Sequence, residues 1–423
     1  MELSAILSEI QETYVADRVP WVIGYSGGKD STTVLQMVFY ALSRLQKRKL
    51  SKEIHVVCND TLVENPAIAG FVDGQLEKIR VAGKTQLFKH KPDLFNVVKV
   101  TPKIEDRFWV NLIGKGYPSP NRWFRWCTER MKINPTNEYI QKTVNGHGRA
   151  IVVLGTRKAE SSNRAASMSN YDTNERLRKH SLPNVFVYAP IADMSNNEVW
   201  AYLLQAPKPW GGSNKELLSL YGNACSGGEC PFMIDTGTQS CGKSRFGCWV
   251  CTVVDRDKSM ENIIENGEKR LEGLLNFRNW LYDIRQQTSQ YVPRHLELDV
   301  KFGCFLLKTR REILRRLLDK QERLCLELIA SEELDYVNNL LEKDSEGQVK
   351  EGLREFVYDL PNRRRVVVVS DFDVLLTPRK RLGPVYLKEA KLVGGRCLSR
   401  NYLQSTRAMY YWRQNGHEQN KRL

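Results

Sequence analysis

The 423-residue sequence lacks long apolar segments: no run approaches the roughly 18 residues that a membrane-spanning helix needs. Its start also lacks the basic and continuously apolar regions of a secretory signal peptide, and instead spaces Leu3, Ile6, Leu7 and Ile10 along one helical face. No internal repeat and no long low-complexity tract occurs. We therefore expect a cytoplasmic protein without membrane contact. Disulfide bonds are disfavoured there, because cytosolic thiols stay reduced.

Acidic residues are scarce relative to basic ones, since 64 Lys and Arg against 49 Asp and Glu give a net charge of +15. From Pro361 to Leu423 there are 14 basic and 4 acidic residues, so +10 of the excess lies in these 63 residues. Such a surface suits a polyanionic partner, because Lys and Arg release counterions from phosphates. The alternative to a polyanionic partner is that the positive charge serves only to keep the protein soluble. We favour contact with a nucleic acid.

Short apolar runs alternate with segments of helical periodicity over the first half of the chain. This alternation predicts an α/β fold with a doubly wound parallel sheet, whose ligands lie beyond the carboxyl ends of the strands. Ser195 and Glu198 form the pattern of a capping box at the start of a helix that ends near Leu204. Strands are expected at residues 19–25, 53–60, 84–90, 149–157 and 185–191.

The stretch YSGGKDST (Tyr25–Thr32) lies between an expected strand and an expected helix. Consecutive glycines let the backbone approach an anion closely, and amides at a helix N-terminus bind phosphate. The stretch is not a Walker A loop, in which Lys is followed by Ser or Thr, because here Lys29 is followed by Asp30. An ordinary glycine-rich turn between strand and helix is the alternative.

The contiguous residues Ser-Gly-Gly-Lys-Asp-Ser resemble the phosphate loop of N-type ATP pyrophosphatases. In that family the loop holds the β,γ-pyrophosphate of ATP while a nucleophile attacks the α-phosphorus. The stretches 56–66, 123–135 and 154–165 resemble the phosphoadenosine phosphosulfate reductase superfamily. Together these resemblances imply nucleotide contacts at Ser26, Gly27, Gly28, Lys29, Asp30, Ser31, Asp60, Thr61, Gly155, Thr156, Arg157 and Arg164.

Over about residues 15–340 the sequence resembles the DNA phosphorothioation sulfurtransferases, most specifically at 230–251 read together with 245–267. Such enzymes act with a cysteine desulfurase and other phosphorothioation proteins, and replace a non-bridging oxygen of a DNA backbone phosphate by sulfur. The resemblance implies DNA as substrate, ATP and Mg²⁺ as cofactors, and a homodimer. It also implies catalytic roles for Lys29, Asp30, Cys127 and Arg157.

Cys127 lies near Arg122, Arg125 and Arg130 in the sequence, and these cations favour a thiolate that could carry a persulfide. A buried structural cysteine is the alternative. Sulfonucleotide reductases use a Glu-Cys-Gly-Leu-His motif that this sequence does not contain, and their cluster-bearing forms have a Cys-Cys pair where this chain has Cys127 alone. A tRNA-thiolating or sulfonucleotide-reducing enzyme with the same loop remains the second hypothesis.

Four cysteines follow the spacing C-x10-C-x6-C-x2-C. Structural zinc sites of four cysteines usually contain two short knuckles, whereas only one is present here. The uneven spacing favours a [4Fe–4S] cluster over zinc, and the resemblance to the phosphorothioation family supports the cluster. The predicted ligands are Cys230, Cys241, Cys248 and Cys251.

The composition changes after residue 205, where a segment rich in Pro and Gly precedes the four cysteines. Long amphipathic helices are expected from Lys258 to about Gln287 and from Thr309 to about Ile329. The sequence thus predicts an ATP pyrophosphatase domain at 1–205, an iron–sulfur loop with a helical region at 206–330, and a basic region at 331–423.

Overall fold

The computed structural model describes residues 3–160, 177–224, 247–290, 304–345, 355–360 and 364–369. The chain forms two compact units. The first comprises Met1–Lys103, Arg130–Trp249 and Asp257–Leu275, and the second comprises Ile104–Glu129, Val250–Arg256 and Asn276–Leu423. The domain division at residues 205 and 330 stays a prediction. Among the described residues, no helix is both long and apolar enough to cross a membrane.

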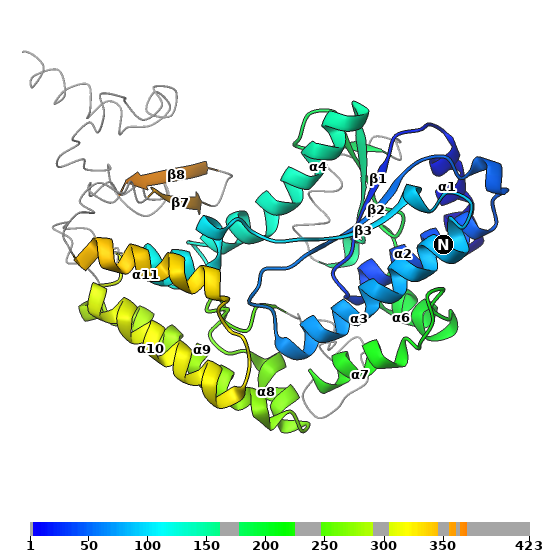
Figure 1. Cartoon of the computed structure of the whole chain (residues 1–423). Helices are drawn as coiled ribbons and strands as arrows, with labels where there is room; N and C mark the ends of the chain where they lie inside the picture. Colours follow the sequence, from blue (N-terminus) through cyan, green and yellow to red (C-terminus); the bar gives the residue numbers. More distant parts are fainter. Residues whose placement is uncertain are drawn as a thin grey trace, which may run out of the picture. The chain divides into compact units, whose positions relative to one another are not determined.

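A six-stranded sheet with the order β3-β2-β1-β4-β6-β5 forms the centre of the first unit (Figure 1). Five strands run parallel, and the short strand β5 pairs antiparallel with β6 at the edge. The predicted α/β class with a mainly parallel sheet is confirmed. The strands span Trp21–Gly24 (β1), Ile54–Asn59 (β2), Phe95–Val100 (β3), Ala150–Val153 (β4), Arg178–Lys179 (β5) and Val185–Tyr188 (β6).

Helices cover both faces of the sheet, because successive strand residues point to opposite sides. Trp21 and Ile23 of β1 join the larger core, to which α1, α2, α3, α6 and α7 contribute. Val22 of the same strand faces the other way and joins Ile140 and Val144 of α4. The helices of this unit span Leu3–Val15 (α1), Lys29–Ser43 (α2), Pro66–Ala82 (α3), Asn134–His147 (α4), Asn196–Gln205 (α6), Lys215–Asn223 (α7) and Lys258–Glu265 (α8).

The strand predicted at residues 84–90 is wrong. Gly83–Leu87 form a π-helical turn directly after α3, and β3 is the third strand of the sheet. Gly83 lies so close to Phe95 of β3 that a Cβ atom there would come within 2.1 Å of the ring. Phe88 is buried against the same ring, with the centroids 5.8 Å apart. The apolar residues after α3 therefore pack onto the sheet from a helical turn and do not join it.

Both predicted amphipathic segments are helical, but the helices begin and end at other residues than predicted. The segment that begins at Lys258 is interrupted near Gly267, whose φ of 122° is outside the helical region, and resumes as α9 (Glu272–Gln286). The later helix, α10, spans Leu307–Leu324 and ends at Cys325, which adopts a left-handed conformation.

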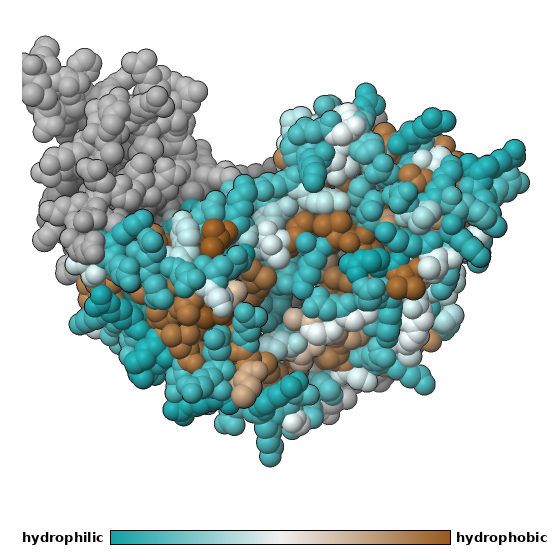
Figure 2. All heavy atoms as spheres, viewed as in Figure 1, coloured by the Kyte–Doolittle hydropathy of each residue, from teal (hydrophilic) through white to brown (hydrophobic). Residues whose placement is uncertain are grey.

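In the second unit, α10 packs against α11 (Ser331–Ser345), and a patch of hydrophobic residues lies between the two helices (Figure 2). Arg310 of α10 is 2 % exposed and donates to the carbonyl oxygen of Ile113 at 2.5 Å. It also forms an ion pair with Asp344 of α11. Because a buried guanidinium needs such partners, Arg310 fixes both helices to the turn at Ile113. Strands Glu355–Leu360 (β7) and Arg364–Val369 (β8) pair antiparallel.

The capping box predicted at α6 is confirmed. Ser195 Oγ accepts from the amide of Glu198 at 3.2 Å, and the Glu198 carboxylate accepts from the amide of Ser195 at 2.7 Å.

Ser195→Ala should lower the free energy of unfolding by about 1 kcal/mol, because the Glu198 amide loses its acceptor. Chemical denaturation measures this loss, and hydrogen exchange of the first α6 amides localises it. Ser195→Thr retains a hydroxyl group and should behave like the wild type. Wild-type exchange rates in the Ala variant would show that the cap does not stabilise α6.

Candidate functional site

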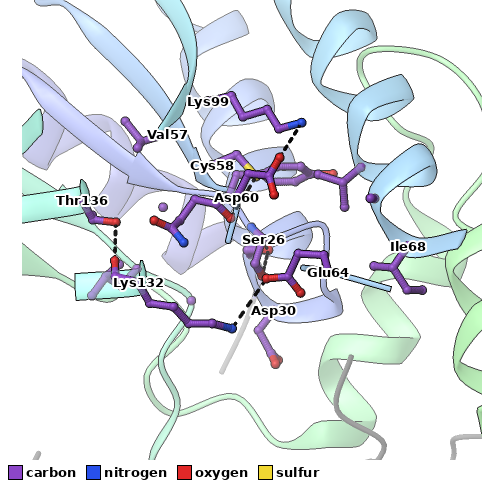
Figure 3. Close-up of a pocket in the computed structure, with 18 of the residues that line it drawn as sticks. Ser26, Asp30, Val57, Cys58, Asp60, Glu64, Ile68, Lys99, Lys132 and Thr136 are labelled. Atoms are coloured by element: carbon purple, nitrogen blue, oxygen red, sulfur yellow. Dashed lines mark hydrogen bonds and ion pairs between the residues drawn. The ribbon is translucent and has the colours of Figure 1, made fainter. Parts of the chain in front are cut away.

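A pocket of about 480 Å³ lies beyond the carboxyl ends of β1, β2 and β4 (Figure 3). This is where open parallel sheets bind ligands, and the volume falls in the range of small-molecule sites. Six of the predicted nucleotide contacts line it, namely Ser26, Asp30, Ser31, Asp60, Gly155 and Thr156. The other predicted contacts in the described part of the chain, Gly27, Gly28, Lys29, Thr61 and Arg157, do not line this pocket.

Two serines of the loop between β1 and α2 form hydrogen bonds within that loop. Ser31 donates to the carbonyl oxygen of Gly28 at 3.1 Å, and the two hydroxyl oxygens of Ser26 and Ser31 lie 3.2 Å apart. Helix α2 begins at Lys29, with Gly28 as a residue that offers no side-chain cap. The amides and partial positive charge of this helix N-terminus suit an anionic ligand.

Gly27 is required by both its conformation and its neighbour. Its φ is +72°, and a Cβ atom there would lie 2.4 Å from Cγ2 of Val72 on α3. Gly155, in the loop after β4, is equally constrained, because its Cβ would lie 2.8 Å from the backbone of Asp30. Gly27 therefore allows the loop to pack against the Val72 side chain, and Gly155 allows the main chain after β4 to approach that of Asp30.

Asp30 connects this loop to the loop after β4. One carboxylate oxygen lies 2.7 Å from Lys29 Nζ, and the other lies 2.7 Å from Arg157 Nε. Arg157 is buried and also donates to the carbonyl oxygen of Met194 at 3.1 Å. Asp30 and Arg157 therefore hold the loop after β1 against the loop after β4.

Lys29 is buried beside Tyr221 of α7. Its amide donates to the Tyr221 hydroxyl at 3.4 Å, and its Nζ lies 6.0 Å from the centre of the ring. Burial raises the pKa of Tyr221 to about 12, so this hydroxyl is neutral at physiological pH. The Lys29 side chain is thus paired with the Asp30 carboxylate and lies near a neutral aromatic ring.

A second cluster of charged side chains includes Asp60, which directly follows β2. Lys99 of β3 lies 2.8 Å from Asp60 (Figure 3). It also lies 2.8 Å from Asp73 of α3. Burial by itself lowers the pKa of Lys99, but the two carboxylates outweigh it and raise that pKa to about 12. Lys99 and Lys132 line the pocket and were missed by the sequence analysis. For Lys99, the reason is that β3 was predicted elsewhere.

Cys58 also lines the pocket, next to Asp60. Burial, followed by the charge of Asp60, raises the pKa of its thiol to about 12. The protonated thiol is a poor nucleophile, which agrees with a structural role for Cys58.

Cys248 packs on the loop after β2. Its Sγ lies 3.3 Å from Thr61 Oγ1 and 3.9 Å from a carboxylate oxygen of Glu64. The backbone is held as well, because Cys248 forms an antiparallel bridge with Glu64, and the Trp249 amide donates to the carbonyl oxygen of Val63 at 3.0 Å. Thr61 therefore contacts a predicted cluster ligand.

Cys251 belongs to the second unit, where the buried Arg278 donates to its carbonyl oxygen at 2.8 Å. Cys230, Cys241 and Arg164 lie outside the described residues. Within the described ranges, no three His, Cys, Asp or Glu side chains are grouped as a metal site would require. The [4Fe–4S] cluster stays a prediction, with two of its four proposed ligands placed.

Cys127 is half-buried in the second unit, at the start of the helical segment that follows the loop with the exposed residues Arg122 and Arg125. Arg130 belongs to the first unit. A role for Cys127 in sulfur transfer therefore stays a prediction.

Gly27→Ala should weaken ATP binding at least about tenfold, because the new methyl group meets Val72 and the residue must keep a left-handed conformation. Isothermal titration measures the affinity. Gly70→Ala is the matched control, since Gly70 lies in α3 with open space around its Cβ position, and it should bind ATP normally. Equal affinities in both variants would contradict the constraint on Gly27.

Two proteins of Methanocaldococcus jannaschii are similar in sequence to part of this chain. The uncharacterized protein MJ0066 is 28% identical over 202 residues, which cover 48% of this chain and 35% of that protein. The uncharacterized protein MJ0973 is 27% identical over 179 residues, which cover 42% and 34% respectively. The chain spans about a third of the length of these curated relatives.

Similar solved structures have low TM-scores. A phosphoadenylyl-sulfate reductase of Candida auris has a TM-score of 0.30 at 14% identity, covering 47% of this chain and 78% of that one. An FMN adenylyltransferase of Candida glabrata has 0.29 at 12%, covering 53% and 61%. A U34-tRNA thiolase of Methanococcus maripaludis with its [4Fe–4S] cluster has 0.26 at 12%, covering 70% and 84%.

A family model supplies the assignment that these pairwise similarities do not. The model of the phosphoadenosine phosphosulfate reductase domain matches residues 20–253, which include the phosphate loop, all six strands of the sheet and the knuckle Cys248–Cys251. The match covers more than half of the 423 residues, and the chain therefore belongs to the phosphoadenosine phosphosulfate reductase domain family.

Proposed function

We propose that this protein is an ATP-dependent sulfurtransferase that introduces sulfur into DNA backbone phosphates. The observation that carries the proposal is the loop after β2. Asp60 and Glu64 of this loop line the pocket beside the phosphate loop, while Thr61 and Glu64 contact Cys248. One short segment therefore joins a site suited to nucleotide phosphates to the segment that carries the cysteines.

The first step of the proposed reaction is adenylylation. A non-bridging oxygen of the DNA phosphate attacks the α-phosphorus of ATP, a P–O bond forms, and pyrophosphate leaves. The phosphate loop, with the N-terminus of α2 and the charge of Lys29, would hold the β- and γ-phosphates and stabilise the leaving group. The DNA phosphate becomes part of an anhydride, from which AMP departs readily.

The second step transfers sulfur. The terminal sulfur of a persulfide attacks the activated DNA phosphorus, a P–S bond forms, and the P–O bond to AMP breaks. A second thiol then cleaves the remaining S–S bond, which leaves a disulfide and the DNA phosphorothioate. We propose Cys127 as the persulfide carrier and a cysteine desulfurase as the source of the sulfur.

Asp30 and Asp60 do not fit as ligands of the Mg²⁺ that would accompany ATP. Asp30 is paired with Lys29 and Arg157, and Asp60 is paired with Lys99. We therefore assign Asp30 to positioning the loop and derive no step through a metal ion bound by these carboxylates.

The cluster proposal makes a spectroscopic prediction. Protein purified without oxygen should be brown and contain iron and sulfide, and Cys248→Ser should lose most of both, because a ligand is removed. Cys325→Ser is the control, since Cys325 is exposed and outside the motif, and it should keep the iron. Stoichiometric zinc, or full iron retention in Cys248→Ser, would rule out the proposed cluster.

Mass spectrometry of nuclease-digested DNA tests the overall function. Cells that express the chain with its desulfurase and other phosphorothioation proteins should contain phosphorothioate dinucleotides. Asp30→Asn should reduce them about a hundredfold, because it disrupts the loop that stabilises the leaving group. Asp193→Asn is the control, since Asp193 is half-exposed and pairs only with Lys158 among the ion pairs of the described residues. Sulfur found in tRNA and absent from DNA would favour the tRNA-thiolating alternative.

A further inference from the structure

An exposed tryptophan stands out on the second unit. Trp123 is 54 % exposed, the highest value among the large hydrophobic side chains that the structure describes. Large aromatic side chains are usually buried, so an exposed one on an ordered loop marks a surface that meets a partner.

The backbone around Trp123 is firmly held. The Asn121 side-chain oxygen accepts from the amides of Trp123 at 2.8 Å and of Phe124 at 2.9 Å. Phe124 is completely buried, and the indole of Trp126 donates to the carbonyl oxygen of Pro118 at 3.0 Å. Trp123 is therefore presented to solvent by a loop whose neighbouring residues are anchored, and little ordering is needed when a partner binds.

The same loop is fastened to the segment that follows Cys251. The carbonyl oxygen of Pro120 accepts from Thr252 Oγ1 at 2.7 Å and from Arg285 at 2.8 Å. Arg285 also donates to the carbonyl oxygen of Thr252 at 2.6 Å. All of these bonds lie within the second unit, and they hold the backbone of the loop at Pro120.

Two exposed arginines, Arg122 and Arg125, lie on either side of Trp123 in the sequence. Neither guanidinium has an ion-pair partner in the described part of the chain. The arginines of α10 differ, because Arg315 and Arg316 both pair with Glu312. The loop therefore offers two exposed cations within two residues of an exposed aromatic side chain.

We infer that the loop Pro118–Arg125 binds a DNA strand, with Trp123 stacked on an unpaired base and Arg122 and Arg125 on the flanking phosphates. Stacking on an aromatic side chain tolerates any base, and guanidinium groups bind phosphates with matched geometry. A base buried in a duplex stack exposes only its edges, so the partner is single-stranded or locally unpaired. The choice of DNA rests on the proposed function. Such a strand would lie on the loop that directly precedes Cys127 in the sequence.

Fluorescence anisotropy with a labelled, gapped DNA duplex and the full-length chain tests this inference. Trp123→Ala should weaken binding about tenfold, and Trp123→Phe should restore most of the affinity. Arg122→Gln with Arg125→Gln should reduce the slope of log affinity against log salt by about 1.4, or about 0.7 for each contact to a single strand. Arg311→Gln with Arg315→Gln removes the same charge from α10 and should leave the slope unchanged.

The outcomes separate this inference from the proposed function. Unchanged DNA binding in Trp123→Ala and in the Arg122/Arg125 variant, with DNA still modified, would overturn the inference alone. Wild-type binding to RNA but not to DNA, weakened by Trp123→Ala, would overturn the choice of DNA and with it the proposed function. Loss of desulfurase binding in the Trp123 variant, with DNA affinity intact, would identify the loop as a protein-docking surface and also overturn the inference.

Discussion

The carboxylate of Asp30 is bound on one side by Lys29 and on the other by Arg157, each at 2.7 Å. Arg157 is buried and also bonded to the carbonyl oxygen of Met194, so this pair joins segments after β1, after β4 and before α6. Removing the carboxylate would leave a buried guanidinium without its counter-charge, which is costly. The geometry of the phosphate loop therefore depends on this pair, and Gly155 permits it by leaving room for the backbone of Asp30.

The loop after β2 extends this constraint to the cysteine-bearing segment. Asp60 is held by Lys99 at one end of the loop, and Glu64 contacts Cys248 through both its side chain and its backbone. The loop after β2 would contact a ligand through Asp60 and Glu64. The same loop would contact a metal cluster through its contact with Cys248. This shared loop is the physical basis for our proposal that phosphate activation and sulfur delivery occur in one protein.

Local patterns were predicted where neighbours in the sequence decide the structure. The capping box at Ser195 depends on residues three apart, and the phosphate loop depends on six contiguous residues between a strand and a helix. Failures came where distant residues decide. The turn after α3 packs on Phe95, which made a strand prediction at 84–90 wrong and concealed Lys99. The bond between Arg157 and Asp30, which lie 127 residues apart, is another contact that the sequence did not predict. The exposure of Trp123 also could not be predicted, because the loop that carries it is held at Pro120 by Thr252 and Arg285, which are distant in the sequence.

The central claim is that the loop around Asp30 directs cleavage of ATP between its α- and β-phosphates. The most direct measurement incubates the full chain with DNA, a persulfide-charged cysteine desulfurase and ATP labelled at the α-phosphorus, and then separates the labelled products together with the released phosphates. Our account predicts that AMP and pyrophosphate form in equal amounts once the adenylylated intermediate has reacted. Formation of ADP and inorganic phosphate would contradict it.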